Sequence, residues 1–156
     1  MFKVFFILIF LIISSSKTLA KEIKGFPKVT DGDTIKINNN KIRLHGIDAP
    51  ELAQMCNKLK KKYSCGLISS KALSKKINKN LVICRVQIRQ DRYGRFIGTC
   101  YLKNLNLNKW MVQNGHAIAY RRYSQEYIKY EEFAKKNSLG IWSGTFIEPE
   151  KWRKLN

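Results

Sequence analysis

Apolar and polar residues alternate along short stretches in the first half of the chain, as they do in half-buried β-strands. Glycine and proline interrupt the first stretch, so we expect a bent strand or an edge strand there. The third stretch carries Arg43 on the face opposite its apolar residues. The predicted strands cover residues 23–29, 34–37 and 41–47, and three asparagines at 38–40 join the last two into a hairpin.

A second hairpin is the clearest element that this pattern predicts. If Ile88 opposes Phe96, the apolar faces of its two strands stack on each other. The same register places Cys84 opposite Cys100. Directly opposed Cβ atoms lie roughly 4.5–5.5 Å apart, which is close to what a disulfide requires. The predicted hairpin covers residues 81–90 and 96–102 around a turn at 91–94.

Apolar residues recur at helical spacing in three other segments. The last of these follows Ser124, which can cap a helix, and Gly140 comes after it as a stop signal. Short strands first and helices later favour an α+β domain with a small barrel over a βαβ layout. The predicted helices cover residues 66–77, 105–114 and 125 to about 136, and a short strand is predicted at 117–120.

The first twenty residues have the pattern of a secretory signal peptide. Lys3 precedes an unbroken apolar run at 4–13, and small residues at 18–20 provide a cleavage site. The run is too short to span a bilayer, which needs about 20 apolar residues. We therefore expect export to a periplasm or out of the cell. An uncleaved, membrane-associated N-terminus is the alternative.

The remaining residues, 21–156, suffice for one domain with one core and are too few for two ordinary domains. We divide them into a core over about 22–143 and a basic tail over about 144–156. Without Lys3 and Lys17, 28 of the 30 basic side chains remain against 11 acidic ones, a net charge of +17. This excess favours polyanionic partners, with nucleic acid first and anionic membrane second, and charge alone does not separate the two.

All four cysteines lie in this part of the chain, and an even count in a small exported domain predicts two disulfides. Spacing alone allows three pairings. The hairpin register favours Cys84 with Cys100, which leaves Cys56 with Cys65. A zinc site is a weaker alternative, because no C-x-x-C pair occurs and the two histidines are scattered. Reduced, buried thiols are the other alternative.

Acidic residues are scarce, yet four of the eleven fall within 21 residues, namely Asp31, Asp33, Asp48 and Glu51. They lie at turns and strand ends. Carboxylates gathered at one end of a barrel repel each other unless a cation joins them. Oxygen ligands without cysteine or histidine favour a hard ion, Ca²⁺ or Mg²⁺. Alternatively, Asp31 and Asp33 form turns by bonding their own backbone, an alternative that is stronger for Asp31.

Two arginines accompany these acids. Arg43 lies on the strand that leads to Asp48 and Glu51, and Arg95 follows the turn of the second hairpin. The planar guanidinium matches a phosphate with two contacts. A metal and arginines that stabilise charge on the phosphate oxygens, with a carboxylate that positions or deprotonates water, are the parts needed for phosphodiester hydrolysis. Each arginine alone is equally consistent with a surface ion pair, so the combination carries the interpretation.

Three ordered segments hold most of these residues: Asp31-Gly32-Asp33-Thr34, Arg43-Leu44 through Ile47-Asp48-Ala49-Pro50-Glu51, and Asp91-Arg92-Tyr93-Gly94-Arg95. They resemble the signature segments of the thermonuclease (staphylococcal nuclease-like) family. The resemblance covers about residues 22–143, and the cysteines resemble those of exported relatives. It implies an OB-fold, a five-stranded β-barrel with three helices, and a Ca²⁺-dependent endonuclease that acts on DNA and RNA.

The resemblance also implies three groups of site residues. Two carboxylates and a backbone carbonyl hold the metal, two arginines bind phosphate beside a carboxylate that acts as base or positions water, and aromatic rings contact the nucleotide. The metal group is Asp33, Asp48 and the carbonyl of Ala49, the catalytic group is Arg43, Glu51 and Arg95, and the nucleotide-binding group is Tyr93 and Tyr120.

The sequence therefore predicts a secreted, monomeric, Ca²⁺-dependent endonuclease of low sequence specificity, with no membrane span after cleavage of the signal. The alternative is a non-catalytic nucleic-acid-binding module of the same fold, which binds with an affinity that falls steeply with salt but does not cut. No arginine or carboxylate of the catalytic set is missing, which favours the enzyme. A basic membrane-surface protein is a more distant third hypothesis.

Overall fold

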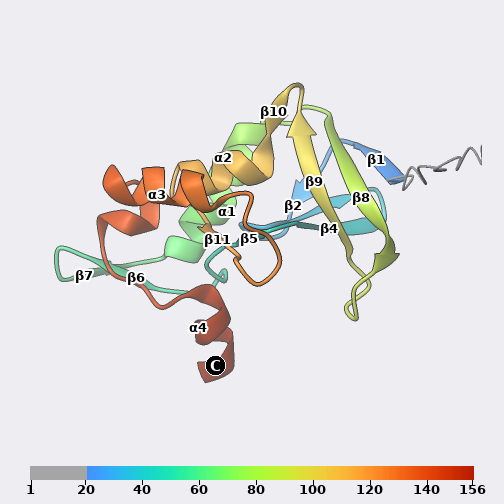
Figure 1. Cartoon of the computed structure of the whole chain (residues 1–156). Helices are drawn as coiled ribbons and strands as arrows, with labels where there is room; N and C mark the ends of the chain where they lie inside the picture. Colours follow the sequence, from blue (N-terminus) through green and yellow to red (C-terminus); the bar gives the residue numbers. More distant parts are fainter. Residues whose placement is uncertain (1–20) are drawn as a thin grey trace, which may run out of the picture.

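The computed structural model describes residues 21–156, and the predicted signal peptide lies outside this described part. A curled sheet forms one side of the molecule and helices pack against it on the other (Figure 1). This arrangement confirms the predicted α+β class with a small, barrel-like sheet. Among residues 21–156, no helix is long and apolar enough to cross a membrane.

The main sheet has the strand order β1-β8-β9-β4-β3-β2, and β10 pairs with the end of β9. Neighbours are antiparallel except β4 and β9, which run parallel. Two short pairs, β5 with β11 and β6 with β7, lie outside it. The strands are β1 (Lys21–Gly25), β2 (Lys28–Val29), β3 (Thr34–Ile37), β4 (Asn40–Leu44), β5 (Ile47–Asp48), β6 (Cys56–Lys58), β7 (Lys61–Tyr63), β8 (Val82–Gln90), β9 (Phe96–Leu102), β10 (Leu105–Asn106) and β11 (Ile118–Ala119).

Strands β8 and β9 form the predicted hairpin, but only part of the predicted register is right. Cys84 pairs with Cys100, and their disulfide is present. Nearer the turn, a bulge shifts the pairing so that Phe96 faces Gln90. The predicted pairing of Phe96 with Ile88 is therefore wrong, and Ile88 is 67% exposed. Apolar alternation does not reveal a bulge, because extra residues in one strand leave the pattern on either side unchanged.

The three predicted helices are present, and a fourth lies in the segment predicted as a basic tail. The third helix begins at Ile128 and not at residue 125. The Ser124 hydroxyl accepts the Glu126 N–H (3.1 Å), a bond that closes a local turn in place of a helix cap. The helices are α1 (Cys65–Ile77), α2 (Leu107–Gln113), α3 (Ile128–Lys136), the 3₁₀ helix η1 (Gly140–Ser143) and α4 (Pro149–Leu155).

The second predicted disulfide, Cys56–Cys65, joins the β6–β7 hairpin to the first residue of α1. Ile118 and Ile141 pack around it in a small apolar cluster. After η1 the chain returns to this hairpin, where Asn57 and Thr145 exchange two backbone hydrogen bonds of 2.9 Å. The tail is thus attached to the domain, and α4 extends from it below the sheet and helices in Figure 1.

Glu131 is a buried carboxylate that ties α3 to β11. One oxygen accepts the Ala119 N–H (3.1 Å), and the other pairs with Arg121 (2.6 Å) and Lys135 (3.0 Å). Because β11 pairs with β5, this contact also supports Asp48. Burial alone would raise the pKa of Glu131, but hydrogen bonds from Arg121 and Lys135 outweigh burial and hold the pKa below its usual value.

We expect Glu131→Gln to lower the free energy of unfolding at pH 7 by roughly 1–3 kcal/mol, because the charged hydrogen bonds are lost. A carboxylate with a lowered folded-state pKa stabilises the fold above its unfolded-state pKa of about 4.3, and this contribution disappears as the pH falls through the folded-state value. The difference in free energy of unfolding between Glu131→Gln and wild type should therefore become smaller below about pH 4. Urea unfolding at a series of pH values measures this difference in the free energy of unfolding. Glu132→Gln, a change at the exposed neighbouring residue, is the control. An equal loss of unfolding free energy in both variants would contradict the prediction.

Candidate active site

An open cleft of about 990 Å³ lies between the turn of the β8–β9 hairpin and α4, which point to the same side of the molecule (Figure 1). The buried residues Asp33 and Asp48 adjoin it through Arg43, which pairs with both. The structure thus brings together side chains from three separate sequence segments, as predicted. The predicted residues that line the cleft are Arg43, Glu51, Tyr93, Arg95 and Tyr120.

Arg43, on the central strand β4, connects the two buried carboxylates. Its Nη1 pairs with Oδ1 of Asp33, and its Nη2 lies 2.8 Å from Oδ1 of Asp48. Asp33 also accepts the Thr34 hydroxyl (3.0 Å) and, through Oδ2, the N–H of Ala49 (2.9 Å). Burial would lower the pKa of Arg43, but the two carboxylates outweigh it and raise the pKa. The predicted role of the Ala49 carbonyl as a metal ligand stays a prediction.

Asp31 fits both predicted alternatives, as a turn former and as a member of the carboxylate cluster. Its Oδ1 accepts the N–H of Asp33 (3.0 Å), which is the local turn bond expected of a turn former. It also lines the cleft, as the carboxylates of Glu51, Asp91 and Glu150 do. Burial, and to a lesser extent the neighbouring carboxylate of Asp33, raises the pKa of Asp31 to about 6.

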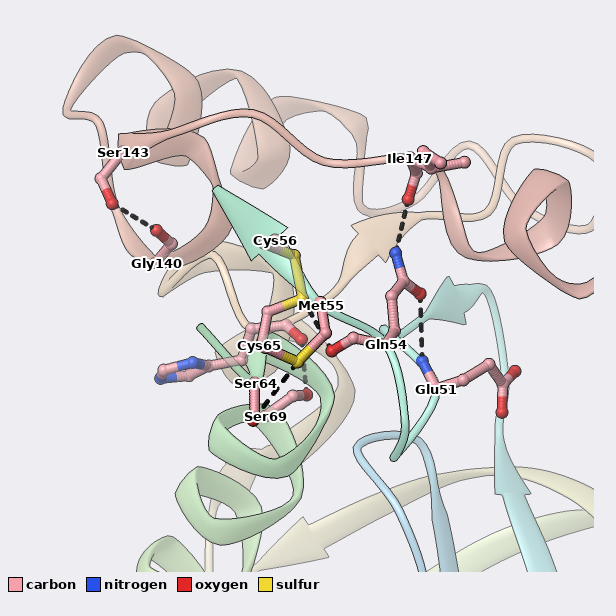
Figure 2. The surroundings of a disulfide bond; sticks show 11 residues. Glu51, Gln54, Met55, Cys56, Ser64, Cys65, Ser69, Gly140, Ser143 and Ile147 are labelled. Carbon is pink, nitrogen blue, oxygen red and sulfur yellow. Dashed lines mark hydrogen bonds between the residues drawn. A yellow bond between two sulfur atoms is a disulfide. The ribbon is translucent and has the colours of Figure 1, made fainter. Parts of the chain in front are cut away.

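Glu51 reaches the cleft from a loop that Gln54 fixes (Figure 2). The buried Gln54 side chain accepts the Glu51 N–H (3.2 Å) and donates to the carbonyl of Ile147 (2.7 Å). The Glu51 carboxylate points away from these contacts (Figure 2). Gly66, beside the Cys56–Cys65 disulfide, packs directly on this loop, since a Cβ there would lie 1.7 Å from the Glu51 carbonyl oxygen.

Replacing Gly66 by alanine is therefore expected to push the Glu51 loop out of place. Overpacking typically costs about 1–3 kcal/mol, and we expect at least that loss in urea unfolding. A misplacement of about 1 Å can slow catalysis about 10²-fold, so the rate should fall as well. Lys71→Ala, an exposed change on the same helix, is the control. A Gly66→Ala protein with wild-type stability and rate would show that this close approach is unimportant.

Arg95 is held by Asp91, the first residue of the hairpin turn. Oδ2 of Asp91 accepts Nε (2.9 Å) and Nη2 (2.8 Å) of Arg95, and Oδ1 accepts the backbone N–H groups of Tyr93 (2.9 Å) and Arg95 (3.0 Å). These bonds outweigh burial and hold the pKa of Asp91 below its usual value. Within residues 21–156, Nη1 of Arg95 has no hydrogen-bond partner, so it is available to a phosphate. Asp91 is thus a positioning residue to which the sequence assigned no role.

The two tyrosines offer aromatic surface at the cleft. Tyr93 is 64% exposed, and the Arg95 guanidinium lies 5.1 Å from its ring centroid. Tyr120 follows β11 and packs edge-on against Tyr123 (4.8 Å between centroids). Burial, with the carboxylates of Asp48 and Glu150 nearby, raises the pKa of Tyr120, so its hydroxyl stays protonated. Both rings are placed where they could stack on bases.

One further residue at this site was not predicted from the sequence. Arg153, on α4, contacts Asp48 through two bonds, Nη1 to Oδ1 (2.9 Å) and Nη2 to Oδ2 (3.1 Å), and its Nη1 also contacts Glu51 (2.7 Å). Burial raises the pKa of Asp48, and the guanidinium groups of Arg153 and Arg43 oppose that rise. Arg153 lies about a hundred residues from these carboxylates in the sequence, in a segment rich in other basic residues, so no local signal distinguishes it.

The curled sheet and this cleft define an OB-fold protein with a carboxylate–arginine site suited to phosphate groups. Residues 41–144 match the family described as staphylococcal nuclease homologue. Three relatives have related sequences. The chain is 34% identical to the succinoglycan biosynthesis protein ExoI of Rhizobium meliloti (79% of this chain, 66% of that protein), 31% to the micrococcal nuclease of Shigella flexneri (83% and 79%), and 30% to an uncharacterized endonuclease of Escherichia coli O157:H7 (92% and 93%).

The chain therefore belongs to the staphylococcal nuclease homologue family. Family membership confirms the resemblance and the OB-fold that the signature segments predicted. The chain spans about two thirds of the length of the Rhizobium relative, and most of the length of the Shigella and Escherichia relatives.

Proposed function

We propose that this chain is a Ca²⁺-dependent endonuclease that hydrolyses phosphodiester bonds of DNA and RNA with little sequence specificity. The observation that carries the proposal is a cleft lined by Glu51 and the partly unpaired Arg95, which two buried aspartates adjoin through Arg43. The names of the Shigella and Escherichia relatives, a micrococcal nuclease and an endonuclease, support it.

The carboxylates fit a hard metal ion. The cluster of Asp31, Asp33, Asp48 and Glu51 holds four carboxylates, and within residues 21–156 the side chains that form ion pairs with it are those of Arg43 and Arg153. Two negative charges are left over, which one divalent cation would neutralise. Nucleases of this family are generally metal-dependent. Among residues 21–156, no three carboxylates, cysteines or histidines converge as a ready-made metal site, because guanidinium groups lie between them.

In this proposal Asp33 and Asp48 hold the metal, with the Ala49 carbonyl as a further ligand. A bound Ca²⁺ would polarise a phosphoryl oxygen and stabilise the charge that develops on it. Arg43 and Arg95 bind the phosphate, since guanidinium groups match its oxygens. Glu51, accessible at the cleft, takes a proton from the attacking water or orients that water.

Substrate binding follows from charge and aromatic surface. The net charge of +17 over residues 21–156 attracts a polyanion. Tyr93 and Tyr120 present π-faces, and stacking accepts any base. Five arginines line the cleft, and the proposed roles of Arg43 and Arg95 are contacts to phosphate, which carry no sequence information. We therefore expect little sequence specificity and activity on single strands of both DNA and RNA.

The decisive assay uses covalently closed circular single-stranded DNA, which an exonuclease cannot cut. Purified protein 21–156 should linearise and fragment it with Ca²⁺ and not with a chelator, and should degrade linear RNA under the same conditions. Salt-dependent binding without cleavage in any metal would instead identify a non-catalytic nucleic-acid-binding module. Cleavage that persists in chelator would contradict the metal dependence.

Export is proposed on the basis of the signal-peptide pattern in residues 1–20. Two disulfides in the described part are consistent with an oxidising compartment. Expression of the full chain in a bacterium, followed by fractionation and mass spectrometry, tests it. We expect a processed chain that begins at Lys21 outside the cytoplasm; a full-length chain retained in the cytoplasm would contradict export.

A further inference from the structure

Helix α4 brings a third arginine into the active site. Arg153 uses both of its terminal nitrogens on the two oxygens of Asp48, and Nη1 also bonds Glu51. Asp48 is fully buried, and among residues 21–156 its Oδ2 has no other donor. The guanidinium therefore occupies the side of Asp48 through which that carboxylate would coordinate a cation.

The position of Arg153 is fixed by contacts outside the carboxylate cluster. Gln54 donates to the carbonyl of Ile147, just before α4. Glu150, in the first turn of α4, lies 3.4 Å from Arg122. The Trp152 N–H bonds the Glu148 carbonyl (2.9 Å), so the residue before Arg153 is helical. These contacts hold Arg153 facing Asp48, whereas the neighbouring Lys151 pairs with Glu148, and its side chain is 69% exposed.

Arg153 shields the oxygen of Asp48 that is most available to a metal. Oδ1 already accepts Arg43 (2.8 Å) and Arg153 (2.9 Å), so Oδ2 is the oxygen with the lowest hydrogen-bond load, and Arg153 covers it. Because the Asp48 side chain is fully enclosed and Arg153 lies over Oδ2, a metal reaches Oδ2 only if the Nη2 contact of Arg153 opens. Two ligands that compete for one site weaken each other by the same factor, because the coupling is reciprocal.

We propose that Arg153 is a positioning residue that balances Asp48 in the metal-free protein and competes with the metal for it. This inference rests on the proposed metal dependence of the site. In the metal-free protein Arg153 balances the charge of the buried carboxylate and orders its side chain through two hydrogen bonds. When the metal binds, the side chain yields Asp48 and remains in the cleft, beside Glu51 and in reach of a substrate phosphate.

The test compares Arg153→Gln with Lys151→Gln, which removes the same charge from the same helix without touching the site. Isothermal titration with Ca²⁺ should give about 5-fold or more tighter binding for Arg153→Gln than for Lys151→Gln, as expected for a coupled pair. Without metal, Arg153→Gln should melt at a lower temperature than Lys151→Gln. Added Ca²⁺ should raise the melting temperature of Arg153→Gln by more than that of Lys151→Gln. A residue with a merely structural role would lower the melting temperature and leave the Ca²⁺ affinity unchanged.

Arg153→Lys provides a second variant, which keeps the charge but lacks the planar fork. It should bind Ca²⁺ more tightly than wild type and less tightly than Arg153→Gln, and it decides the question if Arg153→Gln does not fold. Equal Ca²⁺ affinity of wild type, Arg153→Lys and Lys151→Gln would overturn the inference and leave the proposed function standing. Absence of Ca²⁺ binding in wild type and every variant would overturn both.

Discussion

Replacing Glu51 by alanine is expected to slow cleavage of single-stranded DNA by about 10²–10⁴-fold, the usual contribution of a general base. The fold should survive, because the Glu51 side chain is partly exposed and its backbone contacts to Gln54 do not need the carboxylate. Arg95→Ala should cost about 10²–10³-fold, as the loss of one charge-stabilising donor does. Single-turnover rates at saturating enzyme measure both effects on the chemical step.

Two controls make these variants informative. Arg89→Ala removes an exposed arginine from the same hairpin, outside the cleft, and Glu22→Ala removes an exposed carboxylate from β1. Both should cut at close to the wild-type rate, and circular dichroism should show the same fold in all four variants. Near-normal rates for Glu51→Ala and Arg95→Ala would place the active site elsewhere in the molecule.

The second large effect is expected at Asp48. Asp48→Asn replaces an oxygen that accepts from Arg153 with an amide that donates, and leaves two guanidinium groups facing an uncharged side chain. Removing one partner of a buried ion pair typically costs 3–5 kcal/mol, and we expect about 3 kcal/mol here because Arg153 is partly exposed and Arg43 keeps Asp33. Ca²⁺ binding should be lost as well.

Urea unfolding in chelator measures this loss, and Glu126→Gln, an exposed change of the same kind, is its control. A double-mutant cycle with Arg153→Gln separates the interaction of Asp48 with Arg153 from the other contacts of the cluster. Asp48→Asn should cost less in the Arg153→Gln background than in wild type, since the contact is already absent. Strictly additive losses would show that the two side chains do not interact in solution.

The local patterns of the sequence predicted most of the elements. Alternation located the strands of the two main hairpins. The single interrupted strand predicted at 23–29 is in fact two edge strands, β1 and β2, at opposite ends of the strand order. The short strands β6, β7 and β10 were not predicted. The cysteine register predicted both disulfides, because Cys84 and Cys100 lie where the hairpin is regular. The bulge near Ile88 could not be predicted, since it depends on how the hairpin bends and not on which residues alternate.

The candidate site, too, could be predicted from the sequence only in part. Segments of a few residues predicted that Arg43, Asp48 and Glu51 act together, because β4, β5 and the loop after them carry these residues within nine positions of sequence. The contacts of Gln54 and Arg153 join segments about a hundred residues apart. Such contacts depend on the path of the tail around the β6–β7 hairpin, and nothing in the basic composition of residues 144–156 indicates it.

The central claim is that a metal held by buried aspartates enables Glu51 to cut nucleic acid. One titration tests it most directly: the single-turnover cleavage rate of wild type and Glu51→Ala across buffered free Ca²⁺ concentrations, with Ca²⁺ binding measured on the same samples. Wild type should rise from no detectable cleavage to a plateau that follows Ca²⁺ occupancy. Glu51→Ala should bind Ca²⁺ and stay near zero throughout. Full wild-type cleavage in chelator, or equal rates for the two proteins at saturation, would contradict the account.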